Sequence, residues 1–347
     1  MSDTDRPPDP IERQPFETYR ESILPALREQ LRIAASTPFY REKFETAGID
    51  SADRVDPASL GHLPFTEKDE LRKSQQRAPP FGRHRACDPE EIARVYTTSG
   101  TTGQPTFIGL TDSDVETWAS AGARAARAAG IDQSDVVVGV IAGGPFAGAV
   151  TYDGHRAAGA AVAPVGPGNT ERIVSQFESG CGTALLGTPS YAEYLLDHLR
   201  ERGTDPASLG IERMVVGGEP GAHDSRERIE AAFDCKLTES MGNSDVCISI
   251  WGECTHRQGM HFTGQRAVWP ELVDPETGEG LPWETRVQGE LVYTSLNREC
   301  VPLVRFRSRD RIEVLGTDCE CGRATPRIRC LGRTDDMFLV RGVSVFP

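Results

Sequence analysis

Between residues 135 and 240, short apolar runs alternate with amphipathic segments, and this alternation constrains the fold more than any other feature. The runs are rich in β-branched residues and too short for buried helices, which is typical of strands buried on both faces of a sheet. They are DVVVGVIA (135–142), AAVAPVG (160–166), TALLG (183–187), RMVVGGE (213–219) and CKLTES (235–240). Because parallel strands need crossover connections, the alternation predicts a mostly parallel sheet covered by helices.

The segments between the runs carry helix-capping signals. Helices are expected over 111–130, 169–180 and 188–203. Thr111 or Ser113 can cap the first helix and Asn169 the second, because their side chains accept hydrogen bonds from free backbone amides. Each segment ends on a glycine, which is the residue that most readily adopts the left-handed conformation that closes a helix.

The two ends of the chain follow other patterns. From residue 16 to about 91 apolar residues recur near helical spacing, as at Leu27 and Leu31, whereas residues 1–15 are polar, rich in proline and expected to be flexible. After about residue 248, strands of an antiparallel meander or small barrel are expected, with a turn at DPETGEG. These strands are expected at 260–264, 265–273, 289–296 and 301–308.

The predicted fold class is therefore α/β, with mostly parallel sheets flanked by helices and a smaller β-rich, barrel-like part. The predicted organisation is a flexible segment (1–15), an α/β body (16–247), a β-rich subdomain (248–335) and the opening of a small C-terminal domain (336–347). The chain stops after FLVRGVSVFP, which predicts one strand followed by a further segment, so we expect most of that domain to be absent.

Composition excludes several classes of function. The chain has 52 acidic against 38 Lys and Arg residues, a net charge of −14, which argues against nucleic acid or an anionic membrane as the main partner. It lacks both the roughly 18 continuous apolar residues of a membrane span and the basic, apolar start of a signal peptide. Nine cysteines without a secretion signal indicate reduced thiols, and we expect a cytoplasmic protein.

VYTTSGTTGQPTF (95–107) is the segment richest in chemistry, with two glycines and six Ser/Thr hydroxyls between β-like residues. Glycines allow close approach, and hydroxyls and free amides can surround phosphate oxygens. On composition alone a Ser/Thr-rich surface loop is an equal alternative. A Walker loop is excluded, because it requires G-x-x-x-x-G-K-[ST] before a helix.

TTSGTTGQPT resembles the phosphate-binding loop of the adenylate-forming superfamily of acyl-CoA ligases and carrier-protein adenylation domains. Further segments, in the family's order from about Thr37 to the last residue, resemble the phenylacetate–CoA ligase branch. They are PFYREKFETAGID, LPFTEKDELR, GTPSYAEYL, VVGGEP, VPLVRFRSRD, CECGRATPRI and GRTDDMFLVRGVSVFP.

This resemblance implies an ATP-dependent, AMP-forming ligase that makes an acyl adenylate with Mg²⁺ and then a thioester with coenzyme A. Negative charge at the reacting phosphorus must be held by amides, hydroxyls, the metal and a cation. The residues implied for the phosphates are Thr98, Ser99, Gly100, Thr101, Thr102 and Gly103. Gly218, Glu219 and Pro220 are implied beside adenine, Asp310 at the ribose hydroxyls, Arg333 at ribose or phosphate, and Asp335 at the hinge.

The stretch Glu239, Ser240, Met241, Gly242, Asn243, Ser244, Asp245 corresponds to the family's adenine and Mg²⁺ motif, with departures. Met241 stands where a tyrosine would stack on adenine, and a thioether gives no π-stack. Asp245 stands where a glutamate would hold Mg²⁺, with a shorter reach. Gln104 replaces the usual loop lysine, which removes one positive charge near the phosphates.

Two loops carry a possible zinc set. Two thiolates in Cys-Glu-Cys (319–321), a third thiolate and an imidazole make a tetrahedral site. We predict Cys254, His261, Cys319 and Cys321 as ligands, with His256 as the substitute. The spacing is not that of a standard zinc finger, so reduced, unligated thiols remain the alternative.

The resemblance places the acyl pocket among three loops, and small and aromatic residues there suit a planar apolar acid such as phenylacetate or benzoate. The candidates are Phe146, Ala147, Gly148, Tyr152, Thr188, Pro189 and Gly217. Phe146 is equally compatible with the core.

Three functions remain open. The first is an aryl-acid–CoA ligase, the second an enzyme that loads the acid on a carrier protein, and the third a non-catalytic ligand-binding fragment. The family's catalytic lysine lies on the small C-terminal domain, so we expect this chain to bind substrates but to adenylate poorly. A homodimer is expected from the resemblance.

Overall fold

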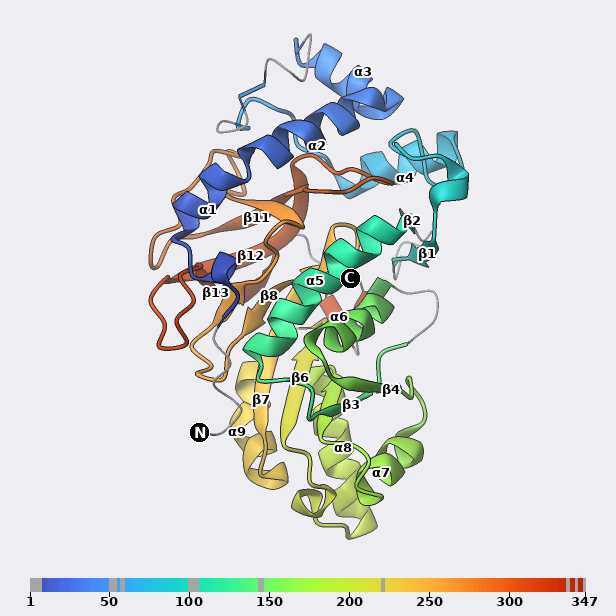
Figure 1. Cartoon of the computed structure of the whole chain (residues 1–347), viewed down its shortest axis with the longest axis vertical. Helices are drawn as coiled ribbons and strands as arrows, with labels where there is room; N and C mark the ends of the chain where they lie inside the picture. Colours follow the sequence, from blue (N-terminus) through green and yellow to red (C-terminus); the bar gives the residue numbers. More distant parts are fainter. Residues whose placement is uncertain are drawn as a thin grey trace.

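The computed structural model describes residues 8–49, 55–56, 60–98, 106–142, 147–219, 222–334, 338–340 and 343–345. Its centre is one sheet of eleven strands in the order β10-β11-β12-β13-β9-β8-β7-β6-β5-β3-β4. In Figure 1 the parallel strands occupy the lower half of the molecule and the antiparallel strands the upper half. The α/β fold class is thus confirmed, and the β-rich part continues the same sheet.

All five strands expected between 135 and 240 are present. They are β3 (Val136–Gly139), β4 (Ala161–Pro164), β5 (Ala184–Gly187), β6 (Arg213–Gly217) and β7 (Lys236–Asn243). Neighbours among them pair in parallel. The side chains alternate between two clusters, since Val137 packs with α5 and α6 and Val138 with α7, α8 and α9. Helices therefore cover both faces, as the near-continuous apolar runs require.

The helices that cover this part include the three expected ones, close to their predicted positions, and two at 150–158 and 222–233 that were not predicted. They are α5 (Asp112–Ala128), α6 (Val150–Ala158), α7 (Thr170–Glu178), α8 (Pro189–Arg202) and α9 (Ala222–Phe233). Thr111 Oγ1 accepts from Asp114 N over 3.1 Å at the start of α5, whereas Asn169 makes no side-chain cap bond. A Cβ on Gly122 of α5 would lie 2.9 Å from Gly154 Cα of α6, so both glycines are needed where the helices cross.

The remaining strands of the sheet are antiparallel. They are β8 (Cys247–Glu253), β9 (Met260–Phe262), β10 (Val268–Val273), β11 (Gln288–Ser295), β12 (Phe306–Gly316) and β13 (Arg327–Arg333). The expected strand at 301–308 is wrong over residues 301–305, because β12 begins only at Phe306. Two short strands, β14 (Phe338–Val340) and β15 (Val343–Val345), pair with each other where a single strand was expected. The domain boundaries stay predictions.

The N-terminal part is helical and packs on the antiparallel end of the sheet (Figure 1). It contains η2 (Pro10–Glu12), α1 (Phe16–Ser22), α2 (Leu24–Ser36), α3 (Pro38–Thr46), α4 (Lys68–Arg77) and a hairpin of β1 (Arg94–Thr97) and β2 (Phe107–Leu110). Residues 8–15 differ from the expected flexible segment, because the buried Glu12 pairs with Arg323 over 2.7 Å. An ion pair across the fold anchors this end, and polarity alone does not reveal it.

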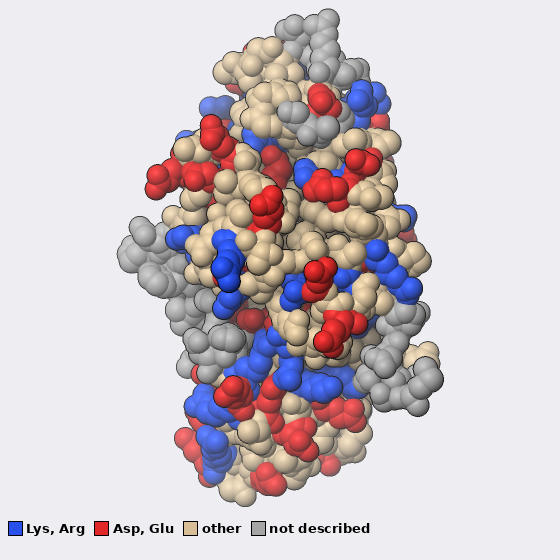
Figure 2. Space-filling model, turned by 90° about the vertical axis from the view of Figure 1, so that its left-hand side faces the viewer, with Lys and Arg blue, Asp and Glu red and all other residues tan. Residues whose placement is uncertain are grey.

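Acidic and basic side chains are interspersed over the face shown in Figure 2, although the chain carries a net charge of −14. Among the helices within the described ranges, none combines the length and apolarity needed to cross a lipid bilayer.

Candidate active site

Thr98 and Thr106 form the base of the predicted phosphate loop. Thr98 N donates to Thr106 O over 3.0 Å, and the two hydroxyl oxygens lie 2.8 Å apart. Both threonines are buried, so the hairpin of β1 and β2 closes tightly under the loop. Ser99, Gly100, Thr101, Thr102, Gly103 and Gln104 lie outside the described residues.

Asp245 stands directly against this loop base. Thr106 Oγ1 donates to Asp245 Oδ1 over 3.5 Å, and Asp245 N donates to Asn243 Oδ1 over 3.0 Å in the turn between β7 and β8. The Asp245 side chain is only 9% exposed. The structure thus brings Thr98 and Asp245, predicted from two separate motifs, to the same place through Thr106, which was not predicted as a site residue.

Lys68, the first residue of α4, forms an ion pair with Asp245. Burial lowers the pKa of the Lys68 ammonium, and the Asp245 carboxylate partly offsets this effect. Sequence reasoning did not assign Lys68 a role. Its only signal was its place in LPFTEKDELR, a segment that supported the family resemblance but has no chemistry of its own.

The expected adenine segments lie side by side at the ends of β6 and β7. Gly217 pairs with Ser240, and a Cβ on Gly217 would lie 2.3 Å from Ser240 O. Gly218 and Glu219 follow, and Glu219 Oε1 accepts from Ser190 N over 2.7 Å, which ties this turn to α8. Pro220 lies outside the described residues.

β7 and β8 approach each other closely beside these segments. A Cβ on Gly242 would lie 1.8 Å from Ile248 O, so this position admits no side chain. Met241 pairs with Trp251 across the strands and is partly buried against the core. The Glu239 carboxylate faces Arg226 at 3.7 Å.

Asp310 and Arg333 are register partners on β12 and β13, and Arg333 Nη1 lies 3.0 Å from Asp310 Oδ1. Without the family resemblance, these two residues would be expected to form an exposed loop ion pair. They are indeed paired, but on strands, with side chains only 14% and 18% exposed. Both Asp310 and Glu239 act on the Cys330 thiol. Burial raises the pKa of Cys330 to about 11, and the negative charges of Asp310 and Glu239 contribute to this increase.

Described members of the expected acyl pocket make contacts within the fold, and their role in an acyl pocket stays a prediction. Tyr152 donates to Ile141 O over 2.6 Å, and its ring fills the space where a Cβ on Gly139 would lie. It is therefore a core side chain between α6 and β3. Thr188 caps α8, and Pro189 is the buried first residue of that helix. Gly148 is described, Phe146 lies outside the described residues, and the side chain of Ala147 is not described.

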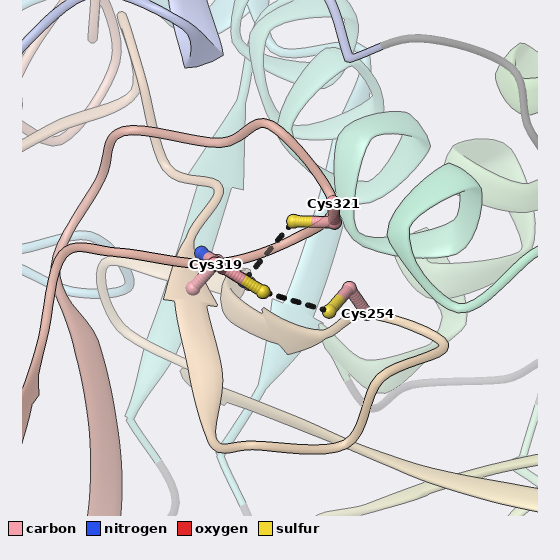
Figure 3. A group of neighbouring side chains, drawn as sticks. Cys254, Cys319 and Cys321 are labelled. Atoms are coloured by element: carbon pink, nitrogen blue, oxygen red, sulfur yellow. Dashed lines mark hydrogen bonds between the residues drawn. The ribbon is translucent and has the colours of Figure 1, made fainter.

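Cys254, His261, Cys319 and Cys321 form a cluster in which all four ligand atoms lie within 4.8 Å of one another. Cys254 follows β8, His261 belongs to β9, and the other two cysteines lie in the loop between β12 and β13. Figure 3 shows the three cysteine side chains converging, with the Cys254 and Cys319 sulfurs 3.7 Å apart. Cys321 Sγ lies 3.4 Å from His261 Nε2.

These separations suit zinc. Tetrahedral zinc, with bonds of about 2.3 Å to sulfur and about 2.0 Å to nitrogen, places its ligand atoms about 3.5–3.8 Å apart. Hydrogen bonds from Cys254 and from His261 lower the pKa of Cys321, so this sulfur is already biased toward the thiolate that metals bind. His256, the substitute ligand, lies outside the cluster and faces Glu320 at 3.6 Å.

The known proteins that resemble this chain agree with a nucleotide-binding site. Residues 42–297 match the AMP-binding enzyme family. The chain is 37% identical to a phenylacetate–coenzyme A ligase of Thermus thermophilus, over 96% of this chain and 75% of that protein. It is 32% identical to the ligase of the same name from Escherichia coli, over 98% and 76% of the two chains.

Solved structures agree. The structure of a 2-hydroxyisobutyryl-CoA ligase in complex with 2-HIB-AMP and CoA superimposes with a TM-score of 0.89 at 30% sequence identity. The match covers 100% of this chain and 76% of that ligase chain. The amide bond synthetase McbA from Marinactinospora thermotolerans has a TM-score of 0.51 at 18% identity, over 74% and 52% of the two chains, which indicates shared fold alone.

Proposed function

The chain belongs to the phenylacetate–coenzyme A ligase family of AMP-binding enzymes, and from that premise we propose that its substrate is an aryl carboxylic acid of the phenylacetate or benzoate class. It is an AMP-forming acid–CoA ligase, which uses ATP to make an acyl adenylate and then a thioester with CoA. The names of its relatives support the aryl class. A small hydroxy acid is the competing class, because 2-hydroxyisobutyrate is named for the related structure.

The observation that carries the nucleotide-binding part of the proposal is the contact of Asp245 with the loop base at Thr106. A carboxylate and hydroxyl oxygens are hard ligands of the kind that Mg²⁺ prefers, so Asp245 fits the metal and Thr98 and Thr106 line its surroundings. Mg²⁺ would neutralise charge on the phosphates. Asp310 would accept the ribose hydroxyls, since a carboxylate can accept two hydrogen bonds, and Arg333 beside it would reach the ribose or phosphate.

The loop residues Ser99, Gly100, Thr101, Thr102 and Gly103 would hold the phosphates, while Gly218, Glu219 and Pro220 with residues 239–243 would line the adenine. Gly217 and Ser240 support this part of the proposal, because their pairing places both segments at the same edge of the sheet. The homodimer and the carrier protein, as an alternative to CoA, remain predictions.

A structural zinc is part of the proposal. Three sulfurs and one imidazole nitrogen within 4.8 Å of one another would make a closed set without an open position, which is typical of zinc that supports a fold. The cluster joins the turn after β8 to the loop between β12 and β13, and that loop also carries Arg323, the partner of Glu12. The zinc would therefore lock the N-terminal segment onto the sheet.

Calorimetric titration tests the function without requiring turnover. The ligands are Mg²⁺·ATP and the acyl-sulfamoyl adenosines of phenylacetate, benzoate and 2-hydroxyisobutyrate, which mimic acyl adenylates. The proposal expects the aryl mimics to bind at least about tenfold more tightly than the hydroxy-acid mimic, a difference of about 1.4 kcal/mol. Equal or reversed preference would contradict the aryl class.

A thioester assay with CoA, and in parallel with a carrier protein bearing phosphopantetheine, identifies the acceptor. Product with CoA supports the proposal, and product with the carrier protein alone supports the alternative. Absence of binding to Mg²⁺·ATP and to every mimic would instead favour the non-catalytic alternative.

A further inference from the structure

Lys68 places a positive charge at the base of the phosphate loop from an element that none of the nucleotide motifs includes. Its ammonium pairs with Asp245 Oδ2, while the other oxygen of that carboxylate accepts from Thr106. The Lys68 side chain is 28% exposed and Asp245 9%, so the pair is partly shielded but Lys68 can still be reached from solvent.

α4 holds Lys68 in a defined position relative to the loop base at Thr106 and Phe107. Gln75, two turns further along α4, donates to Phe107 O over 2.7 Å and accepts from Phe107 N over 3.0 Å. Phe107 is the residue after Thr106, so this two-way amide pair ties the helix directly to the loop base. At the N-terminus of α4, Glu67 Oε2 accepts a hydrogen bond from Arg309 Nη2 over 2.7 Å. Lys68 is thus held from both sides.

The charges around Lys68 indicate a role in binding phosphate. The loop sequence over residues 98–106 contains no Lys or Arg, so it supplies no cation of its own. In the structure Lys68 and Asp245 neutralise each other, although a triphosphate needs a cation and a divalent metal needs a carboxylate. If Lys68 leaves Asp245 for the triphosphate, the phosphates gain a cation and the Asp245 carboxylate becomes available to the metal.

We propose that Lys68 is a phosphate-binding residue: when ATP binds, its ammonium leaves Asp245 and contacts the oxygens of the β- and γ-phosphates, so that Asp245 becomes available to the divalent cation. This inference rests on the proposed nucleotide site. It deepens that proposal by assigning recognition of the pyrophosphate part of ATP to the N-terminal helical region. No covalent bond changes in this exchange.

The test compares Lys68→Met, Lys68→Arg and the matched control Lys73→Met, which removes an exposed lysine from the same helix. Each variant is titrated with Mg²⁺·ATP and with phenylacetyl-sulfamoyl adenosine, which has no pyrophosphate part. Charge-assisted bonds to phosphate are strong, so Lys68→Met should weaken ATP binding about 10- to 100-fold. Binding of the mimic should change less than about twofold, Lys68→Arg should restore much of the ATP affinity, and Lys73→Met should match wild type.

Thermal unfolding without ligand shows whether each variant is folded at the titration temperature. Two outcomes overturn the inference while leaving the proposed function intact: unchanged ATP affinity in Lys68→Met, or equal loss for ATP and the mimic, since the latter would mean that Lys68 only supports the site. If wild type binds neither ligand, the proposed function is wrong and this inference falls with it.

Discussion

Arg333 on β13 donates to Asp310 on β12 over 3.0 Å, so the carboxylate predicted to accept the ribose hydroxyls already holds a cation. The pair is mostly buried, with side-chain exposures of 18% and 14%. A ribose that binds here must share the carboxylate with Arg333, whose guanidinium holds the Asp310 side chain in place.

Asp310→Asn is expected to weaken ATP and the acyl-adenylate mimic alike, because both carry the ribose. Loss of charge on the acceptor should cost about 1.5–3 kcal/mol, which corresponds to about 10- to 100-fold in affinity. Isothermal titration measures both ligands. Asp197→Asn on the exposed face of α8 is the control and should leave both affinities unchanged. Selective loss of ATP alone would contradict a ribose contact.

Purified chain is expected to contain about one zinc per molecule, and Cys254→Ser should lose it because a serine hydroxyl is a poor zinc ligand. Since bound metal adds its binding energy to folding, the variant should also unfold several degrees lower. Metal analysis and a thermal melt give the two readings. Cys181→Ser, at an exposed position away from the cluster, should keep both metal and melting temperature. A wild-type chain with far less zinc would disprove the site.

Glu12→Gln is expected to destabilise the fold by about 3–5 kcal/mol, because it leaves the Arg323 charge buried without its partner. The two side chains are only 2% and 5% exposed and lie 2.7 Å apart. Chemical denaturation measures the free energy of unfolding. As control, Glu29→Gln breaks an exposed pair with Arg32 and should cost about 1 kcal/mol or less. Similar costs for both variants would show that burial of the first pair does not matter.

His84 is expected to make stability depend on pH. Burial lowers its pKa to about 4, against an ordinary value of 6.5. Between these values the unfolded chain binds a proton that the folded chain does not, so stability falls as the pH drops from about 6.5 to 4, by about 3 kcal/mol in total.

The check is the free energy of unfolding across that pH range for wild type, His84→Gln and the exposed control His62→Gln. His84→Gln should show a shallower decline than wild type, and His62→Gln should follow wild type. Parallel curves for wild type and His84→Gln would mean that this imidazole does not carry the dependence.

Met241→Tyr is expected to tighten nucleotide binding if position 241 contacts adenine as the family resemblance implies. An aromatic ring can stack on a base, and such contacts contribute about 0.5–1.5 kcal/mol, or about 2- to 10-fold in affinity. Titration with ATP measures the gain in affinity. Met214→Tyr cannot serve as the control, because the Met214 side chain is fully buried and a larger ring would disturb the core. Ile248→Tyr, on a partly buried neighbouring strand position, is the better control, and equal gains in both would argue against stacking.

The local features of this fold could be predicted because they depend on neighbours in the chain. The five strands between residues 135 and 243, the cap at Thr111 and the closing glycine at Gly203 follow from residue type and spacing alone, although β4 lies at the edge of the sheet and is not buried. The cluster of three cysteines and one histidine was also predicted from the sequence. Few other residue types bind zinc, so the number of candidate ligands in the chain is small.

Only the tertiary structure decided which distant side chains meet. Lys68 reaches Asp245 across 177 positions and Glu12 reaches Arg323 across 311, while Tyr152, predicted for the acyl pocket, turns into the core. Local periodicity determines which face of an element is apolar, but it contains no information on which charged residue will stand opposite another. That is decided by the order of strands in the sheet, and burial then makes each such pair energetically important.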